Sequence, residues 1–271
     1  MTPAKTVLTI HDLSSVGRCA LTVCMPALSA AGLQCVPLPT AVLSTHTGGF
    51  KGMARRDLTD YMKEAAAHWK GLGLRFDAMY TGYLSDPAQG EVVLDLIEYA
   101  RKEGDALVLV DPAMGDDGAL YHSIDPAMPQ VMRELCKRAD VATPNQTEAL
   151  ILCGEDPAGV LTSEEEAKRL FEGIGARDWV VTGAKIGEAH VNLLRDGKVP
   201  YHRHAGAYPG TGDLFASVLL GRILTGESLM EAAAFAARFV EGAVEDTIEM
   251  GTQARMGLQF ERRLYQLAPG T

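Results

Sequence analysis

The stretch AYPGTGDLFASVLLG, residues 207–221, places two glycines, a threonine and an aspartate directly before an apolar run. Glycine has no side chain, so Gly210 and Gly212 let a ligand approach the backbone closely. A helix that begins here presents unpaired N–H groups and the positive end of its dipole, which hold a phosphate well. Asp213 would then stand beside that phosphate as a base for an attacking hydroxyl. A turn with a helix cap would explain the carboxylate but not both glycines.

Three further carboxylates, Asp111, Asp116 and Glu148, follow two other apolar runs. Like charges brought together destabilise one another unless a cation neutralises them. Oxygen ligands without His or Cys favour Mg²⁺, which usually binds carboxylates together with phosphates. This cluster therefore indicates a nucleotide. No GxxxxGK[ST] occurs in the chain, which excludes a P-loop, and no GxGxxG follows the first apolar run, which argues against a common dinucleotide site.

Residues this far apart need a scaffold that gathers them. Short apolar runs, such as residues 6–10 and 106–110, alternate with helical stripes such as residues 91–102. This alternation predicts an α/β fold with a mostly parallel central sheet and helices on both faces. Asp196-Gly197, between two strand-like runs, predicts an antiparallel hairpin at one edge. Because no linker, repeat or shift in composition interrupts the chain, we expect a single domain over residues 1–271.

Ligands of such sheets bind at the carboxyl ends of the strands. Polar and glycine residues follow nearly every predicted strand, at positions 11–12, 44–49, 81–83, 111–116, 144–148 and 182–185. Each has a plain structural explanation as well: Asp111-Pro112 can start a turn, residues 143–145 can cap a helix, Glu148 can be a solvated helix residue, and His46 is expected to be a hydrogen-bonded structural histidine. Their joint occurrence at one edge favours a ligand site.

The overall composition limits the partners. The 271 residues are 47% hydrophobic and carry a net charge of −10, which disfavours nucleic acid and anionic membrane surfaces. Five cysteines without a CxxC pair indicate free, buried thiols. The N-terminus lacks signal-peptide architecture, and the longest apolar stretch, residues 19–33, contains Pro26 and Gly32 and is too short to span a bilayer. We therefore expect a cytoplasmic protein.

The segment GTGDLFASVLLG resembles the signature of the ribokinase-like small-molecule kinases. Nearly the whole chain is similar to their vitamin B6 branch, the pyridoxal kinases. The matching segments, in the family's order, are TIHDLSSVG, STHTGGFKG, YTGYL, VDPAMGD, TPNQTEA, VTGAK and GTGD. GTGD is shared by the whole superfamily, whereas DPxxGD followed by TPNQTEA is specific to pyridoxal and hydroxymethylpyrimidine kinases. The resemblance implies transfer of the ATP γ-phosphoryl group to the 5′-hydroxymethyl group of a B6 vitamer.

The resemblance also implies roles for individual residues. Asp213 matches the catalytic base, and Gly210, Thr211 and Gly212 match the anion hole. The Mg²⁺ ligands, direct or through water, are Asp111, Asp116 and Glu148. The residues near ATP are Asn145, Thr182, Lys185 and Asp111. A monovalent cation such as K⁺ matches Thr143 and Thr182, with Asp111. The residues around the substrate ring are His11, Asp12, Val16, Thr47 and Tyr83.

Some alternatives stay open. Asp12 stands where pyridoxal kinases usually carry serine, in a shorter loop, so the chain is also read as a hydroxymethylpyrimidine kinase. Asp12 is otherwise a cap for a helix that begins near Val16. A non-catalytic nucleotide- or PLP-binding regulator would not need the four carboxylates. Residues 48–57, GGFKGMARRD, would be a flexible cover over the phosphates or a solvated basic turn. Members of the family are commonly homodimers.

Overall fold

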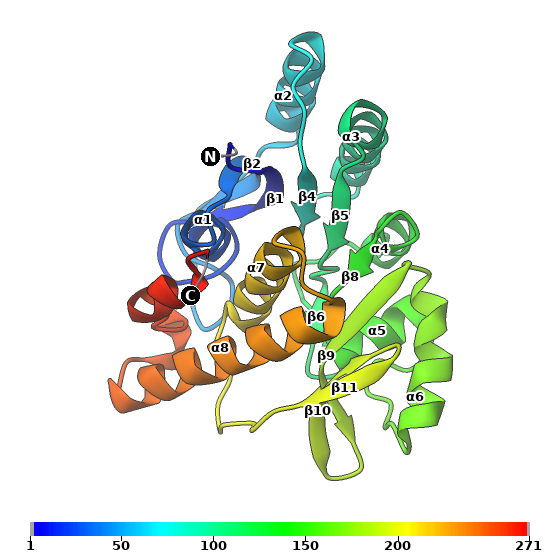
Figure 1. The fold of residues 1–271 in the computed structure, drawn as a ribbon, viewed down its shortest axis with the longest axis vertical. Helices are drawn as coiled ribbons and strands as arrows, with labels where there is room; N and C mark the ends of the chain where they lie inside the picture. Colours follow the sequence, from blue (N-terminus) through cyan, green and yellow to red (C-terminus); the bar gives the residue numbers. More distant parts are fainter. Residues whose placement is uncertain (1–2, 270–271) are drawn as a thin grey trace.

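The computed structural model describes residues 3–269, and within them a nine-stranded sheet forms the centre of the molecule (Figure 1). Its order is β11-β10-β9-β8-β5-β4-β1-β2-β3. The parallel strands are β1 (Thr6–Ser14), β2 (Gln34–Leu43), β4 (Ala78–Thr81), β5 (Leu107–Val110), β8 (Val141–Ala142) and β9 (Asp178–Ile186). The mostly parallel sheet that the alternating pattern predicts is confirmed.

Both edges of the sheet are antiparallel. The predicted hairpin is confirmed as β10 (Ala189–Leu194) and β11 (Gly197–Pro200). At the opposite edge, β3 (Arg55–Asp57) pairs with the end of β2. The sequence did not predict β3, and its residues belong to the segment 48–57 that we expected to be a flexible cover. Because residues 55–57 pair with β2 and the carbonyl of Ala54 bonds to Ser44, only residues 48–53 can still form a flexible cover. A separate two-stranded ribbon consists of β6 (Gly115–Asp116) and β7 (Ala119–Leu120).

Helices cover the two faces of the sheet. One apolar cluster packs the sheet against α2 (Thr59–Gly71), α3 (Ala88–Gly104), α4 (Met128–Cys136), α5 (Gln146–Cys153) and α6 (Glu164–Phe171). The second packs it against α1 (Leu21–Ala30), α7 (Thr211–Leu224) and α8 (Leu229–Glu249). Short 3₁₀ segments span Glu172–Ile174, Ala254–Met256 and Glu261–Leu267. In β5, Val108 and Val110 face the first cluster and Leu109 the second, which explains its continuous apolar run.

The first strand is longer than its apolar run. β1 continues to Ser14, so His11 and Asp12 lie within the strand rather than after it. Its pairing with β2 shifts register between His11 and Leu13, an irregularity that re-aims side chains at the end of a strand. Within residues 3–269, none of the helices combines the length and the hydropathy that crossing a membrane requires. The single-domain organisation stays a prediction, which one continuous sheet favours.

Candidate active site

Helix α7 begins within the stretch 207–221, directly after Gly210. Gly210 is its N-cap with φ +85°, a conformation that favours glycine, and a Cβ there would collide with the carbonyl oxygen of Arg18. The helix's first backbone bond runs from the N–H of Leu214 to the carbonyl of Gly210, at 2.9 Å. The N–H groups of residues 211–213 therefore remain outside the helical bonding, as at any helix start. These donors and the helix dipole make the start of α7 suited to an anion.

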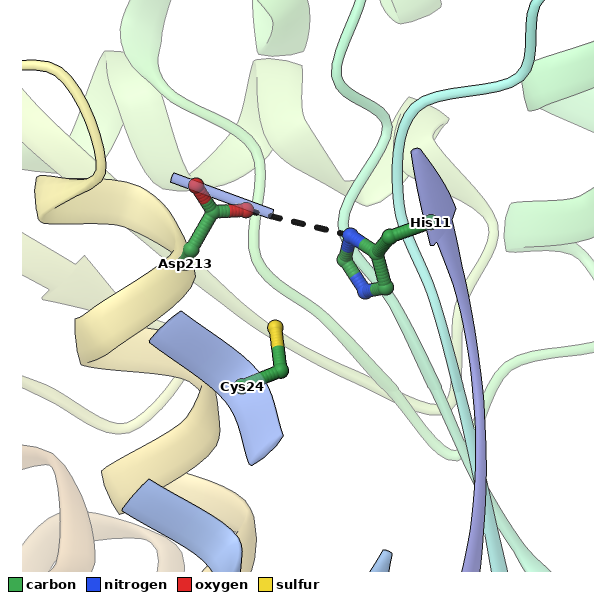
Figure 2. Close-up of side chains that lie close together, drawn as sticks. All are labelled: His11, Cys24 and Asp213. Atoms are coloured by element: carbon green, nitrogen blue, oxygen red, sulfur yellow. Dashed lines mark ion pairs between the residues drawn. The ribbon is translucent and has the colours of Figure 1, made fainter. Parts of the chain in front are cut away.

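The Asp213 carboxylate belongs to the first turn of α7 and is held in place from α1. Its Oδ2 accepts the N–H of Ala20 at 2.8 Å, and its Oδ1 lies 3.8 Å from Nδ1 of His11. Figure 2 shows these two side chains facing each other, with Cys24 of α1 beside them. Burial raises the pKa of Asp213, and the N–H of Ala20 opposes that shift. The carboxylate is thus fixed and prone to take up a proton.

Asp111 follows β5 and faces α7. A Cβ built on Gly212 would lie 3.8 Å from Oδ2 of Asp111, so the missing side chain leaves room between the carboxylate and the helix start. Burial raises the pKa of Asp111 well above its usual range, and the charges of Glu148 and Asp213 add to the shift. Asp111 is therefore electrostatically coupled to both of the other carboxylates.

Glu148 is buried and bonded on both oxygens. Its Oε1 accepts the N–H groups of Met114 (3.0 Å) and Gly115 (3.4 Å), and its Oε2 accepts that of Asn145 (2.9 Å). Asn145 caps α5 in return, because its Oδ1 accepts the N–H of Glu148 at 2.9 Å. The helix cap expected at residues 143–145 is therefore confirmed. The alternative that Glu148 is a solvated helix residue is wrong, because only 3% of the residue is exposed. Burial raises the pKa of Glu148 to about 8, although these backbone hydrogen bonds lower it.

Asp116 completes the group of carboxylates. It lies on β6 and is exposed, its Oδ1 accepts the N–H of Asp117 at 2.8 Å, and partial desolvation raises its pKa. The charge of Arg203 lowers that pKa, and the charge of Asp116 raises the pKa of Glu148. Sequence reasoning missed Arg203, because no motif connects the loop before α7 with the ribbon β6–β7.

Tyr121 is a second residue that the sequence did not indicate. Desolvation raises the pKa of its partly exposed phenol, and the charges of four carboxylates raise it further: Glu148, Asp116, Asp111 and Asp213. The phenol is therefore electrostatically coupled to all four. Tyr121 follows the two-residue strand β7, too short to leave a recognisable pattern.

His11 lies at the centre of the expected substrate region. Its ring stacks edge-on against Tyr80 at 4.4 Å, and a Cβ on Gly82 would collide with it. Both ring nitrogens are buried, and neither has a hydrogen-bond partner among the described residues. Burial lowers its pKa to about 3, so the ring is neutral near pH 7. Unpaired buried nitrogens need a partner, and a ligand can supply one.

Asp12 is also buried at this end of β1. Its Oδ2 accepts the hydroxyl of Ser14 at 2.8 Å. Burial raises its pKa to about 6, and the charge of Asp213 raises it while that of Arg55 lowers it. The alternative that Asp12 caps a helix near Val16 is wrong, because α1 begins at Leu21 with Ala20 as its N-cap.

The other expected ring residues are less enclosed. Val16 and Thr47 are exposed, and Tyr83 is half-buried, with its pKa raised by burial and lowered by the charge of Arg55. Beside Thr47, His46 is the structural histidine that we expected. Its Nδ1 accepts the N–H of Gly48 at 3.0 Å, and its Nε2 lies 2.7 Å from the carbonyl oxygen of Arg255. His46 thus links the start of the segment 48–53 to the 3₁₀ segment Ala254–Met256.

The remaining expected residues lie along β8 and β9. Thr182 forms a parallel bridge with Asn145, and its hydroxyl donates to the carbonyl of Pro144 at 3.4 Å. The buried hydroxyl of Thr143 has no partner within residues 3–269. Lys185 is exposed, and its backbone N–H bonds to Gln146. Its ammonium group forms no ion pair with any described carboxylate, so the structure does not bring it into the cluster.

Known proteins resemble this chain in sequence and in fold. The profile of the phosphomethylpyrimidine kinase family matches residues 25–257. A pyridoxine/pyridoxal/pyridoxamine kinase of Bordetella bronchiseptica is 32% identical over 260 residues, 90% of each chain. A candidate phosphomethylpyrimidine kinase of Bacteroides thetaiotaomicron, crystallised with pyridoxal, is 38% identical with a TM-score of 0.89, covering 97% of this chain and 96% of that one.

A more distant structure has the same fold. The pyridoxal kinase of Leishmania donovani, in complex with ADP and pyridoxine, is 26% identical with a TM-score of 0.80, covering 97% of this chain and 95% of that one. The chain therefore belongs to the phosphomethylpyrimidine kinase family of ribokinase-like small-molecule kinases, and within it to the pyridoxal kinases. The fold and the kinase class that the motifs indicate are confirmed.

Proposed function

We propose that this chain transfers the γ-phosphoryl group of ATP to the 5′-hydroxymethyl group of a B6 vitamer, with Asp213 as the base. The observation that carries the proposal is the start of α7. There, N–H donors free of helical bonding adjoin a partly buried carboxylate held at 2.8 Å by the N–H of Ala20. The donors at residues 211–213 would bind the phosphoryl group in transfer, while Asp213 accepts the proton of the attacking hydroxyl. The relatives in complex with ADP, pyridoxal or pyridoxine support these substrates.

The carboxylates fit a magnesium ion. The side chain of Asp111 accepts no hydrogen bond from a described residue, is buried, and has Glu148 and Asp213 as neighbouring charges. We therefore assign a direct contact to Asp111. Glu148 already accepts three backbone N–H bonds, so it would hold the ion's water. Mg²⁺, when bound, neutralises charge on the ATP phosphates. Asp116 would also hold water bound to the ion. Arg203 would lie near the phosphates.

The remaining predicted roles complete the proposal. The unpartnered hydroxyl of Thr143 and that of Thr182 would contact a monovalent cation such as K⁺. Asn145 is occupied as a helix cap and would act on the nucleotide through the loop that it bonds, because its Nδ2 donates to the carbonyl of Gly115 at 2.8 Å. Lys185 would have to swing from solvent to reach a phosphate. The homodimer and the cytoplasmic location stay predictions.

Around the substrate ring, the polar groups come from the end of β1. His11 offers a neutral imidazole whose nitrogens lack partners, and Asp12 offers a carboxylate that Ser14 holds. A ring with a phenolic oxygen and a pyridine nitrogen would satisfy both groups. Hydroxymethylpyrimidine is the second candidate, because the family profile is that of phosphomethylpyrimidine kinases and its exocyclic amine also suits Asp12.

The test is a side-by-side assay of ATP consumption with pyridoxal, pyridoxine, pyridoxamine and hydroxymethylpyrimidine. We expect the highest kcat/KM for a B6 vitamer, with the phosphate on its 5′ oxygen. A preference for hydroxymethylpyrimidine would replace the first candidate by the second. Binding of ATP and pyridoxal without turnover of any of the four would favour the non-catalytic regulator instead.

A further inference from the structure

A group of potential metal ligands lies outside the proposed active site. One atom each of His204, Glu241 and Glu245 lies within 4.8 Å of the other two. Glu241 and Glu245 are one turn apart on α8, and His204 comes from the loop that leads from β11 to α7. Figure 1 shows this loop running beside α8. The backbone N–H of His202 also donates to Oε1 of Glu241 at 3.2 Å, which holds the loop against the helix.

The three side chains have few partners among the described residues: Glu241 accepts the N–H of His202, and the ring of His204 packs edge-on against that of His202. Nε2 of His204 is shielded from solvent, and no described residue hydrogen-bonds to it. Two carboxylates four residues apart on a helix repel each other. Arg263, whose pKa is raised by Asp246 and further by the charge of Glu245, is engaged by Asp246, with its Nε 2.6 Å from Oδ2. Neither Glu241 nor Glu245 forms an ion pair with a residue in the described part of the chain. A bound cation would satisfy all three side chains.

We infer that His204, Glu241 and Glu245 bind a divalent transition-metal ion of the zinc type. An imidazole with two carboxylates suits Zn²⁺, which commonly takes three protein ligands and a water, whereas Mg²⁺ prefers oxygen ligands alone. Bonds of about 2.0–2.2 Å bring tetrahedral ligand atoms to roughly 3.4 Å from one another. Glu245 is exposed and unbranched, so a change of its rotamer can bring its carboxylate closer, and the loop that carries His204 must move toward Glu241 by about 1 Å.

The position of this metal site also bears on the proposed function. Only this part of the inference, and not metal binding, rests on that function. Arg203, next to His204 in sequence, acts electrostatically on Asp116. The same loop leads directly into Gly210. A metal ion that fixes His204 to α8 would restrict the loop, and with it the approach of Arg203 to the nucleotide phosphates. Metal binding itself is independent of that function and is tested without it.

The test titrates Co²⁺, a spectroscopic substitute for Zn²⁺, into the full chain without nucleotide or Mg²⁺. We expect one equivalent to bind with visible d–d bands, and Zn²⁺ but not Mg²⁺ to displace it. His204→Ala and Glu245→Gln should each weaken binding by about 10- to 100-fold or more, since even outer-shell changes cost that much. Thermal melting verifies folding, and Glu245, being exposed, can change without harm to the core. Glu249→Gln, a further turn along α8, is the matched control and should bind as the wild type does.

Two results would overturn the inference. One is the absence of Co²⁺ binding by the wild type, or binding that both variants retain. The other is a thiolate-to-cobalt charge-transfer band that Cys24→Ser abolishes, because His11, Cys24 and Asp213 are the other close set of potential ligands within residues 3–269. That band would assign the ion to the proposed active site instead.

Discussion

Nδ1 of His11 lies 3.8 Å from Oδ1 of Asp213, so the end of β1 and the start of α7 present a ring nitrogen and a carboxylate to the same space (Figure 2). An ion pair at this distance would require a protonated ring, yet burial lowers the pKa of His11 to about 3. The ring is therefore neutral under physiological conditions. A neutral neighbour does not stabilise the ionised form of Asp213, whose pKa burial raises, and the carboxylate keeps its capacity to accept a proton.

The residue at position 12 should influence the choice of substrate. A hydrogen bond to a charged group is worth about 1.5 to 3 kcal/mol, which corresponds to a preference of about tenfold or more. We expect substrates with an amine or a protonated ring to be favoured over neutral ones, and Asp12→Ser to shrink the ratio of kcat/KM for pyridoxamine over pyridoxal. An unchanged ratio in steady-state assays at pH 7.5 would remove Asp12 from substrate recognition.

Asp12 should also make folding stability depend on pH. Its folded pKa of about 6 lies above the ordinary value of 3.8, so the native state favours the protonated carboxyl. This contribution is fully present below pH 3.8 and is lost as the pH rises through about 6. A shift of this size corresponds to at most about 3 kcal/mol. Asp12→Asn should gain stability relative to the wild type between pH 4 and pH 7, measured by urea unfolding.

The matched control for this experiment is Asp60→Asn, on the exposed face of α2. The difference in unfolding free energy between that variant and the wild type is measured over the same range as the reference for an exposed carboxylate. If the Asp12→Asn difference varies with pH no more than this reference does, burial does not penalise the ionised Asp12.

The magnesium requirement should depend on Glu148. Glu148→Gln removes a carboxylate that a bound cation would keep ionised, so we expect a several-fold increase in the Mg²⁺ concentration that gives half-maximal activity. Because Glu148 also belongs to a capping box, the matched control is Glu231→Gln, the same change in the capping box of α8. Glutamine can take the place of glutamate in a capping box, so both variants should stay folded, and only Glu148→Gln should shift the Mg²⁺ titration. Identical titrations for the wild type and both variants would rule out the metal role.

Residues 48–53 should become protected when both substrates bind. Residues 48–53 precede β3, and His46 holds their first residue by accepting the N–H of Gly48. Closure over the phosphates would shield the Lys51 peptide bond from trypsin. We expect cleavage at Lys51 to slow severalfold with a non-hydrolysable ATP analogue and pyridoxal together, while cleavage elsewhere is unaffected. Equal rates with and without ligands would favour the solvated basic turn.

The sequence predicts those parts of the molecule that local patterns determine. The run at 106–110 predicts a strand buried on both faces, and the turn at Asp196-Gly197 predicts the hairpin. Residues 143–145 predict the cap of α5. The four carboxylates follow motifs, so their electrostatic coupling could be predicted before the structure, while their roles stay predictions.

Other features depend on contacts between distant segments and leave no local signal. The three charged residues of β3 form a strand because the end of β2 offers them backbone partners. Tyr121 follows a two-residue strand and Arg203 belongs to an irregular loop, and both are coupled to the carboxylates only electrostatically. The strand β1 extends past its apolar run to Ser14. The sequence does not indicate this extension, because the polar residues His11 and Asp12 interrupt the apolar pattern.

The most direct test of the proposed chemistry is the turnover of Asp213→Asn with ATP and the preferred B6 vitamer. Loss of a general base lowers the rate by about 10²- to 10⁴-fold, whereas the N–H donors at the start of α7 remain in place. We therefore predict a fall in kcat of that size with an ATP dissociation constant within about twofold of the wild type, both measured on protein that melts like the wild type. Near-complete turnover by this variant would contradict the assignment of Asp213 as the base.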